Sequence, residues 1–388
     1  MKHLSFITET FTESVIREMT RVSDAMNGLN LSQGFPDFES PAEIKQAAIR
    51  AINQNWNQYP VTFGEPELRE AISRKALAYN HIKSNPDTDI TVTCGATEAM
   101  IATLTAIINP GDEIIIFEPF YENYGPDGIL SGAKPKYVKL YTPDWHFDFD
   151  ELAAAFNSNT KAIIINTPNN PTGKVFTRAE FQFIASLCQQ WDCYAITDEI
   201  YEHIIYDGCQ HISLASVPGM ENRTITINSI SKTYSVTGWR VGWAIASADI
   251  TARIRKVHDF LTVGAPTPFQ HAAAEALAFP GEYYTQLQHK YDVSRTHLTE
   301  TLVKSGFKPF NPKGAYYIIT DVSELFDAMK AESDMDFSKK LIARTRVATV
   351  PGSSFYNGNN VITKQVRFAF CKKPETLEAV RQLFSTLL

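Results

Sequence analysis

The chain has 388 residues, a net charge of −7 and 44% hydrophobic residues. This length exceeds one ordinary compact domain, so we expect one large and one smaller domain. The acidic balance and the lack of Lys/Arg runs argue against nucleic-acid binding. No window approaches the ~20 uninterrupted apolar residues of a membrane span, and the N-terminus lacks a signal-peptide pattern. We therefore expect a cytoplasmic protein without membrane contact.

The first 30 or so residues are too few to fold alone, and we expect them to join the second domain or to lie across an interface. From about residue 90, short β-branched runs alternate with longer amphipathic stretches. Several runs are apolar throughout, which is typical of strands covered by helices on both faces. The expected strands are 89–94, 112–119, 134–140, 160–168, 192–199, 223–230 and 241–247, and the expected helices between them include 97–108, 121–132 and 177–190.

These elements predict an α/β fold with a three-layer αβα large domain, residues 40–275, around a mostly parallel seven-stranded sheet. After about residue 275 the pattern changes to a long charged helix at 281–304, several short apolar segments and a final helix at 374–387. This pattern predicts a smaller α+β domain, formed by residues 1–39 and 276–388.

Polar residues end four of the expected strands, at the edge where open α/β sheets bind ligands. The first ending, "CGATE" at 94–98, runs through a glycine into a helix start, which suits an anion or phosphate. A tight turn with Thr97 as helix cap is the alternative. The second, "NTPNNPTG" at 166–173, offers asparagine amides on a loop fixed by prolines, although a plain turn also uses these residues.

Asp198 forms the third ending, and a carboxylate at the end of a buried strand implies a buried cation nearby. A salt bridge to some arginine is the ordinary alternative. Lys232 forms the fourth ending, where burial and a neighbouring cation such as Arg240 would lower its pKa and free a nucleophilic amine. A lone lysine is more often a solvated surface group. The coincidence of four polar endings on one edge favours the functional interpretation.

An amine nucleophile, an anion site, a buried carboxylate and a phenol together suit pyridoxal 5'-phosphate. Lys232 would form the Schiff base, and the helix start with Arg240 would hold the phosphate. Asp198 would keep the pyridine nitrogen protonated, and Tyr201 can bond the ring hydroxyl. The five cysteines are odd in number and lack a CxxC spacing, so we expect neither a disulfide framework nor a metal site.

The chain also resembles the fold-type I pyridoxal-phosphate aminotransferases of class I/II. The motifs that carry the resemblance run through nearly the whole chain: "LNLSQGFPDF" (29–38), "NQYPVTFGEPELREAI" (57–72), "TCGATEA" (93–99), "NTPNNPTG" (166–173), "TDEIYEH" (197–203), "SISKTYSVTGWRVGW" (229–243), "PKGAYY" (312–317) and "VRFAFCK" (366–372). Within the family the chain looks most similar to the methionine aminotransferase and kynurenine/glutamine transaminase branch.

By matching motif, the resemblance implies that Lys232 carries the Schiff base and the proton of the 1,3-shift. Asp198 would pair with the pyridine nitrogen, and Tyr201 and Asn170 would bond the ring oxygen. Tyr121 would stack on the ring, in a position where better-known relatives have phenylalanine or tryptophan. The resemblance also implies a phosphate site made of Gly95, Ala96, Thr97, Ser229, Arg240 and Tyr59 of the partner subunit.

Arg367 would clamp the substrate α-carboxylate as a planar bidentate donor, helped by Asn170 and the backbone of Gly34. The sequence has no evident counterpart of the second arginine that aspartate-specific members use for a distal carboxylate. Because family members share active sites between two subunits, the resemblance implies a homodimer.

The activity implied is ping-pong transamination from a neutral, bulky amino acid, such as methionine, glutamine or an aromatic residue, to a 2-oxo acid. A cysteine-conjugate C–S β-lyase remains an alternative because it would use the same cofactor residues. A non-catalytic cofactor-binding module of a regulator is a further alternative. It would require a fused basic DNA-binding domain, and only about 30 residues precede "LSQGFPDF". No GxGxxG follows any expected strand, which disfavours an NAD dehydrogenase.

Overall fold

The central sheet of the protein has the predicted architecture. The computed structural model describes residues 2–358, 361, 363–385 and 387. Its seven-stranded sheet has the order β2-β8-β7-β6-β5-β3-β4. Only β8 runs antiparallel to its neighbours β2 and β7, so the mostly parallel α/β sheet is confirmed. The strands are β2 (Ile90–Thr93), β3 (Glu113–Glu118), β4 (Lys134–Lys139), β5 (Thr160–Asn166), β6 (Tyr194–Asp198), β7 (Thr224–Ser229) and β8 (Gly242–Ile245).

Helices cover both faces of this sheet, as the continuous apolar runs require. Alternate residues of β3 show it: Ile114 and Ile116 pack in one core cluster, and Ile115 and Phe117 pack in another. The first cluster includes side chains of α4 (Gly95–Ile107), α5 (Tyr124–Leu130) and α8 (Ala248–Leu261), and the second includes those of α6 (Phe149–Ala155) and α7 (Arg178–Gln190). The helices α2 (Ala42–Asn53), α3 (Pro66–Lys75) and α9 (Thr267–Ala276) pack around β2 and β8.

A second, smaller sheet lies in the C-terminal part of the chain, with the order β12-β13-β10-β9. Its strands are β9 (Lys308–Pro309), β10 (Tyr317–Asp321), β12 (Val350–Pro351) and β13 (Gln365–Ala369). Helices α10 (Gly281–Lys304), α11 (Ser323–Ala328), α12 (Asp334–Thr345) and α13 (Pro374–Phe384) accompany it. The final helix therefore ends at Phe384, before the predicted residue 387. Residues 386 and 388 lie outside the described residues.

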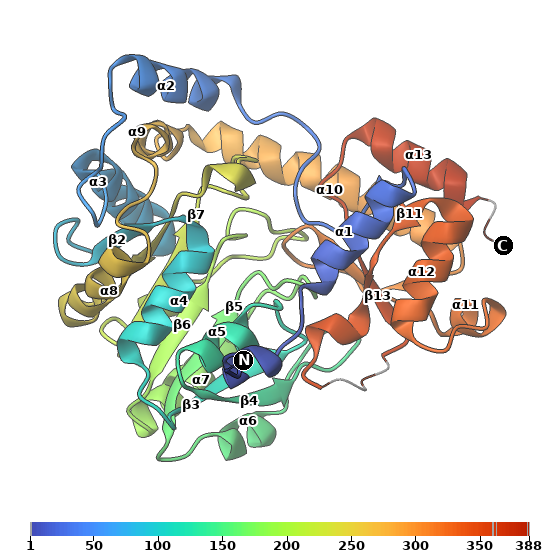
Figure 1. The fold of residues 1–388 in the computed structure, drawn as a ribbon, viewed down its shortest axis with the longest axis horizontal. Helices are drawn as coiled ribbons and strands as arrows, with labels where there is room; N and C mark the ends of the chain where they lie inside the picture. Colours follow the sequence, from blue (N-terminus) through green and yellow to red (C-terminus); the bar gives the residue numbers. More distant parts are fainter. Residues whose placement is uncertain (1, 359–360, 362, 386, 388) are drawn as a thin grey trace.

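The N-terminal segment folds against this C-terminal part. Strand β1 (Leu29–Asn30) pairs in parallel with β11 (Val347–Ala348), and α1 (Val15–Ala25) contacts β11 and β12. Figure 1 shows α1 in blue beside the orange and red elements of the C-terminal part. These contacts connect the first residues to the C-terminal part, while the assignment of residues 1–39 to a second domain and the limits at 39/40 and 275/276 stay predictions.

Short turns complete the secondary structure: η1 (Phe6–Glu9), the π-helical turn η2 (Ala76–Asn80), η3 (Leu214–Ser216), η4 (Thr237–Trp239) and η5 (Gly352–Phe355). Within the described part of the chain, no helix combines the length and the apolar character needed to cross a membrane.

Candidate active site

A cavity of about 640 Å³ lies at the carboxyl ends of β5, β6 and β7. Parallel neighbours end at the same edge of a sheet, and the register of β5 on β6 pairs Asn166 with Asp198. All predicted site residues except Gly95 and Tyr59 line this cavity. The lining members of that set are Gly34, Ala96, Thr97, Tyr121, Asn170, Asp198, Tyr201, Ser229, Lys232, Arg240 and Arg367.

The start of α4 forms one end of the cavity. Helix α4 begins directly after β2 with Gly95, whose φ of 82° and missing Cβ make room for Arg240. A Cβ on Gly95 would lie 2.3 Å from Nη2 of Arg240. Thr97 makes no cap hydrogen bond, because the N-cap is Cys94 without a side-chain bond. The interpretation of this ending as an ordinary turn capped by Thr97 is therefore wrong, and a helix start beside a guanidinium suits a phosphate.

Lys232 follows β7, and its Nζ donates a hydrogen bond to the carbonyl oxygen of Gly34 at 3.2 Å. Its ammonium lies 5.9 Å from the centroid of the Tyr201 ring. Burial, with Arg240 and Arg367 nearby, lowers the pKa of Lys232 to about 8, against the opposing effects of Cys371 and Asp198. A substantial share of this amine is therefore uncharged near neutral pH, which is the state that a nucleophile or a proton acceptor needs.

Asp198 is buried at the end of β6 and accepts two hydrogen bonds. The phenol of Tyr124 donates to its Oδ2 at 2.7 Å, and the backbone N–H of Ile200 donates to its Oδ1 at 3.3 Å. Burial raises the pKa of Asp198 to about 6, which these hydrogen bonds and Lys232 oppose. In the described part of the chain Asp198 forms no ion pair, so the salt bridge to an arginine is not found. A buried carboxyl that faces a cavity and forms no direct ion pair suits a protonated ring nitrogen.

Arg367 lies on β13 and is fully buried. Its Nη1 donates to Oδ1 of Asn170 at 2.8 Å, and its Nη2 donates to the carbonyl oxygen of Ser32. Its guanidinium stands 4.2 Å from the centroid of the Tyr317 ring. Its Nε has no hydrogen-bond partner among the described residues. A buried guanidinium with a free N–H and no facing carboxylate is suited to bind a carboxylate ligand.

The predicted tyrosines occupy different environments. Tyr201 is buried, and its hydroxyl is 3.0 Å from that of Tyr317. Tyr121 packs edge-on against Tyr124, with the ring centroids 5.7 Å apart. Tyr59 lies outside the cavity of its own chain and is 84% exposed.

Sequence reasoning missed several residues of the cavity wall. Tyr124 had a usable signal, because it stands three residues after Tyr121 in "EPFYENY", a segment already assigned to the site. Tyr317, the last residue of "PKGAYY", also belongs to a quoted motif. No local pattern marks the contributions of α1 and its N-cap, which are Ser14, Ile16 and Arg17, or the carboxyl of Asp127 on α5.

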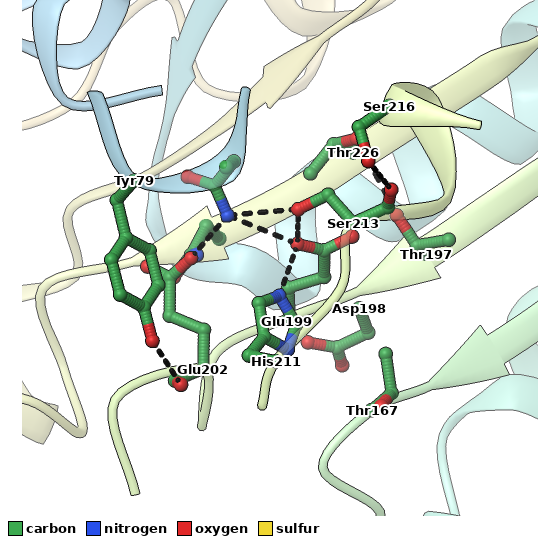
Figure 2. Close-up of polar contacts among 12 residues, drawn as sticks. Tyr79, Thr167, Thr197, Asp198, Glu199, Glu202, His211, Ser213, Ser216 and Thr226 are labelled. Atoms are coloured by element: carbon green, nitrogen blue, oxygen red, sulfur yellow. Dashed lines mark hydrogen bonds and ion pairs between the residues drawn. The ribbon is translucent and has the colours of Figure 1, made fainter. Parts of the chain in front are cut away.

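A second polar cluster lies near the end of β6, around Glu199, Glu202 and His211 (Figure 2). Oε2 of Glu199 accepts from Nε2 of His211 at 2.8 Å, and Oε2 of Glu202 accepts from Nδ2 of Asn80 at 2.7 Å. Lys75 pairs with Glu202 and, against the effect of burial, lowers its pKa to about 2. Carboxylates and an imidazole in such proximity could hold a metal, but the ammonium of Lys75 already supplies the cation. The cluster is best understood as a buried ionic support for β6.

Comparisons with known proteins agree with this geometry. The family model for aminotransferase class I and II matches residues 26–383. Kynurenine–oxoglutarate transaminase 1 of Homo sapiens is 37% identical, over 94% of this chain and 93% of its own. A crystal structure of YbdL from Escherichia coli, whose title identifies a methionine aminotransferase function, has a TM-score of 0.93 and 34% identity, with 99% of each chain covered. N-succinyldiaminopimelate aminotransferase from Mycobacterium tuberculosis has a TM-score of 0.95 and 34% identity, with 100% of both chains covered.

Proposed function

The chain belongs to the aminotransferase class I and II family, and we propose that it moves the amino group of a neutral, bulky amino acid to a 2-oxo acid. The convergence of Lys232, Asp198 and Arg367 on one cavity carries this proposal. Relatives named as kynurenine–oxoglutarate transaminases and the methionine aminotransferase function of a structural neighbour support methionine, glutamine and aromatic donors. No observation favours the β-lyase or the regulatory module over transamination.

The residues of the cavity fit pyridoxal 5'-phosphate. The phosphate would lie at the start of α4, with Arg240, Ser229 and Thr97 as donors. Asp198 would face the ring nitrogen. Tyr201 and Asn170 would bond the ring oxygen, and Tyr121 would cover the ring face. When bound, this cofactor supplies the electron sink that stabilises the charge left at the substrate α-carbon after its proton is removed.

The protein's own residues then position the substrate and move one proton. Arg367 is held by Asn170 and Ser32 before substrate arrives, so its free Nε and its charge can fix the α-carboxylate without reorganisation. The amine of Lys232, with a pKa lowered to about 8 by burial, can take the α-proton at Nζ and return it elsewhere. Buried tyrosines flank this amine, because the ring centroids of Tyr201 and Tyr316 each lie 5.9 Å from Nζ.

We also propose that the working form is a homodimer in which Tyr59 completes the phosphate site of the partner subunit. The observations that support this are the exposure of Tyr59 and its absence from the residues that line its own cavity. Apolar side chains near it in the sequence are exposed as well, including Ile52, Trp56 and Val61. Exposed apolar side chains of this kind are suited to a contact between protein chains.

A panel of amino donors against several 2-oxo acids tests the proposed activity. We expect wild-type protein to convert methionine or an aromatic amino acid to its 2-oxo acid, with one amino acid formed per donor consumed. Lys232→Ala should abolish turnover, whereas the matched control Lys304→Ala, at an exposed lysine, should retain it. With a cysteine conjugate as substrate, pyruvate and ammonia as the main products would instead identify a β-lyase. Absence of turnover on every donor would contradict both enzymes.

A further inference from the structure

Asp127 is an unexplained carboxyl in the wall of the active-site cavity. It lies on α5, three residues after Tyr124 and therefore on the same side of the helix. Its side chain lines the cavity, although the residue is only 8% exposed. Among the described residues its Oδ2 is buried and has no hydrogen-bond partner. A buried oxygen of this kind is unfavourable unless the group stays protonated or has a role in the loaded site.

The other carboxyls that line the cavity have partners. Glu98 accepts from His258 and Thr262, and Glu122 accepts from Ser14. Asp198 accepts from Tyr124. Asp127 is thus the one cavity carboxyl, in the described part of the chain, with a buried and unpartnered oxygen.

Burial alone raises the pKa of Asp127 to about 7, so its charge changes within the working pH range. Tyr121, Tyr124 and Glu98 do not titrate in that window, whereas the pKa of Asp198 is raised to about 6 and lies close to it. Burial keeps the pKa values of Tyr121 and Tyr124 above their ordinary range, and hydrogen bonds from His258 and Thr262 keep the pKa of Glu98 low against burial. The elements packed on α5 carry further titratable groups. Tyr137 of β4 approaches Gly125 of α5, and Asp198 of β6 bonds Tyr124. Glu118 lies on β3, and Glu98 of α4 bonds His258 and Thr262.

Tyr124 connects Asp127 to the ring-nitrogen end of the cavity, because its phenol donates to Asp198 and its helix carries Asp127 one turn further on. We propose that Asp127 is a positioning residue that acts beside Tyr124 to strengthen the hold of Asp198 on the proton of the cofactor ring nitrogen. This inference rests on the proposed function. An ionised Asp127 adds negative charge near Asp198, and a negative charge makes removal of a nearby proton less favourable.

The size of this effect follows from Coulomb's law. In general, a unit charge at a separation of about 10 Å and an effective dielectric constant of about 20 shifts a pKa by on the order of one unit. Asp127→Asn keeps the shape of the side chain and removes the charge. The ring nitrogen of the loaded variant should therefore lose its proton at a pH about one unit lower than in wild type.

The experiment loads wild type and Asp127→Asn with pyridoxal phosphate labelled with ¹⁵N in the ring, and follows the ¹⁵N chemical shift from pH 6 to pH 10. Two further variants serve as controls. Asp127→Glu keeps the charge and should restore the wild-type titration. Glu118→Gln removes another buried carboxyl. Burial also raises the pKa of Glu118, but Glu118 does not line the cavity, so this variant should leave the titration of the ring nitrogen unchanged.

An Asp127→Asn titration that coincides with wild type, or an equal shift in Glu118→Gln, would overturn the proposal for Asp127. In either case wild-type transamination would remain, so the proposed function would stand. Failure of wild type to bind pyridoxal phosphate or to transaminate would overturn the proposed function itself, and the inference with it. If Asp127→Asn does not fold, Asp127→Ser provides the same removal of charge with a smaller side chain.

Discussion

The lowered pKa of Lys232 leads to a quantitative prediction for the protein without cofactor. Burial lowers this pKa from 10.5 to about 8. At pH 7.5 the uncharged fraction of the amine then rises from about 0.1% to about 24%, an increase of roughly 240-fold. Because only the uncharged amine attacks an aldehyde, capture of pyridoxal phosphate should be fast at neutral pH. Its rate should level off above about pH 8.

Stopped-flow absorbance between pH 6 and pH 10 measures this capture. A simple lysine amide is run in parallel, so that ionisation of the aldehyde itself can be divided out, and Lys232→Ala protein gives the background from exposed lysines. The expected ratio of protein rate to model rate is largest near neutral pH and falls as the model amine loses its proton. A ratio that stays constant up to pH 10 would refute the lowered pKa, and with it the role of burial at this site.

Three other changes test separate parts of the site. Arg367→Lys removes the planar pair of guanidinium donors and should raise KM for the amino donor about 10- to 100-fold, in line with about 1.5–3 kcal/mol for charge-assisted hydrogen bonds. An unchanged KM in steady-state assays would exclude a role of Arg367 in binding the substrate carboxylate. Tyr59→Ala protein mixed with Lys232→Ala protein should regain tight cofactor binding that neither protein has alone. In the mixed dimer, one site combines the intact Lys232 of one subunit with the intact Tyr59 of the other. No gain in an equilibrium titration of the cofactor would argue against shared sites. Lys75→Met leaves the buried Glu202 without its cation and should lower the free energy of unfolding by about 3–5 kcal/mol. The control Lys304→Met, at an exposed ion pair, should change the free energy of unfolding by about 0.5 kcal/mol or less. Equal denaturation midpoints for the two variants would contradict the assigned ionic support.

Much of the large sheet could be predicted because its strands are buried on both faces. Runs such as "AIIIN" and "EIIIFE" are apolar at consecutive positions, which is the pattern of a strand covered on both faces. The observed strands fall within the predicted ranges. The direction of β8 was not predicted, although the spacing held the signal. Only 12 residues separate Ser229 at the end of β7 from Gly242 at the start of β8, and they form a loop and the η4 turn, without the crossover helix that a parallel return usually needs.

The site could be predicted only where it rests on strand ends. The order of the strands in the sheet brings Asp198 and Lys232 to one edge. The sequence pattern already predicted this, because both residues stand at the ends of predicted strands. The contribution of α1 depends on the pairing of β1 with β11, which joins residues near 29 and 347. No local pattern encodes a contact at that separation. The same holds for the hydrogen bond between Tyr124 and Asp198, which depends on how α5 packs beside β6.

Trapping the cofactor on the protein tests the central claim most directly. Wild-type protein loaded with pyridoxal phosphate is reduced with borohydride, digested and mapped by mass spectrometry, and Lys232→Ala protein is treated in the same way. We expect one pyridoxyl increment, on the peptide that contains Lys232, and no stoichiometric increment in a folded Lys232→Ala variant that has lost transamination. An increment on another lysine, or full transamination by Lys232→Ala, would contradict the role of Lys232 as the Schiff-base residue.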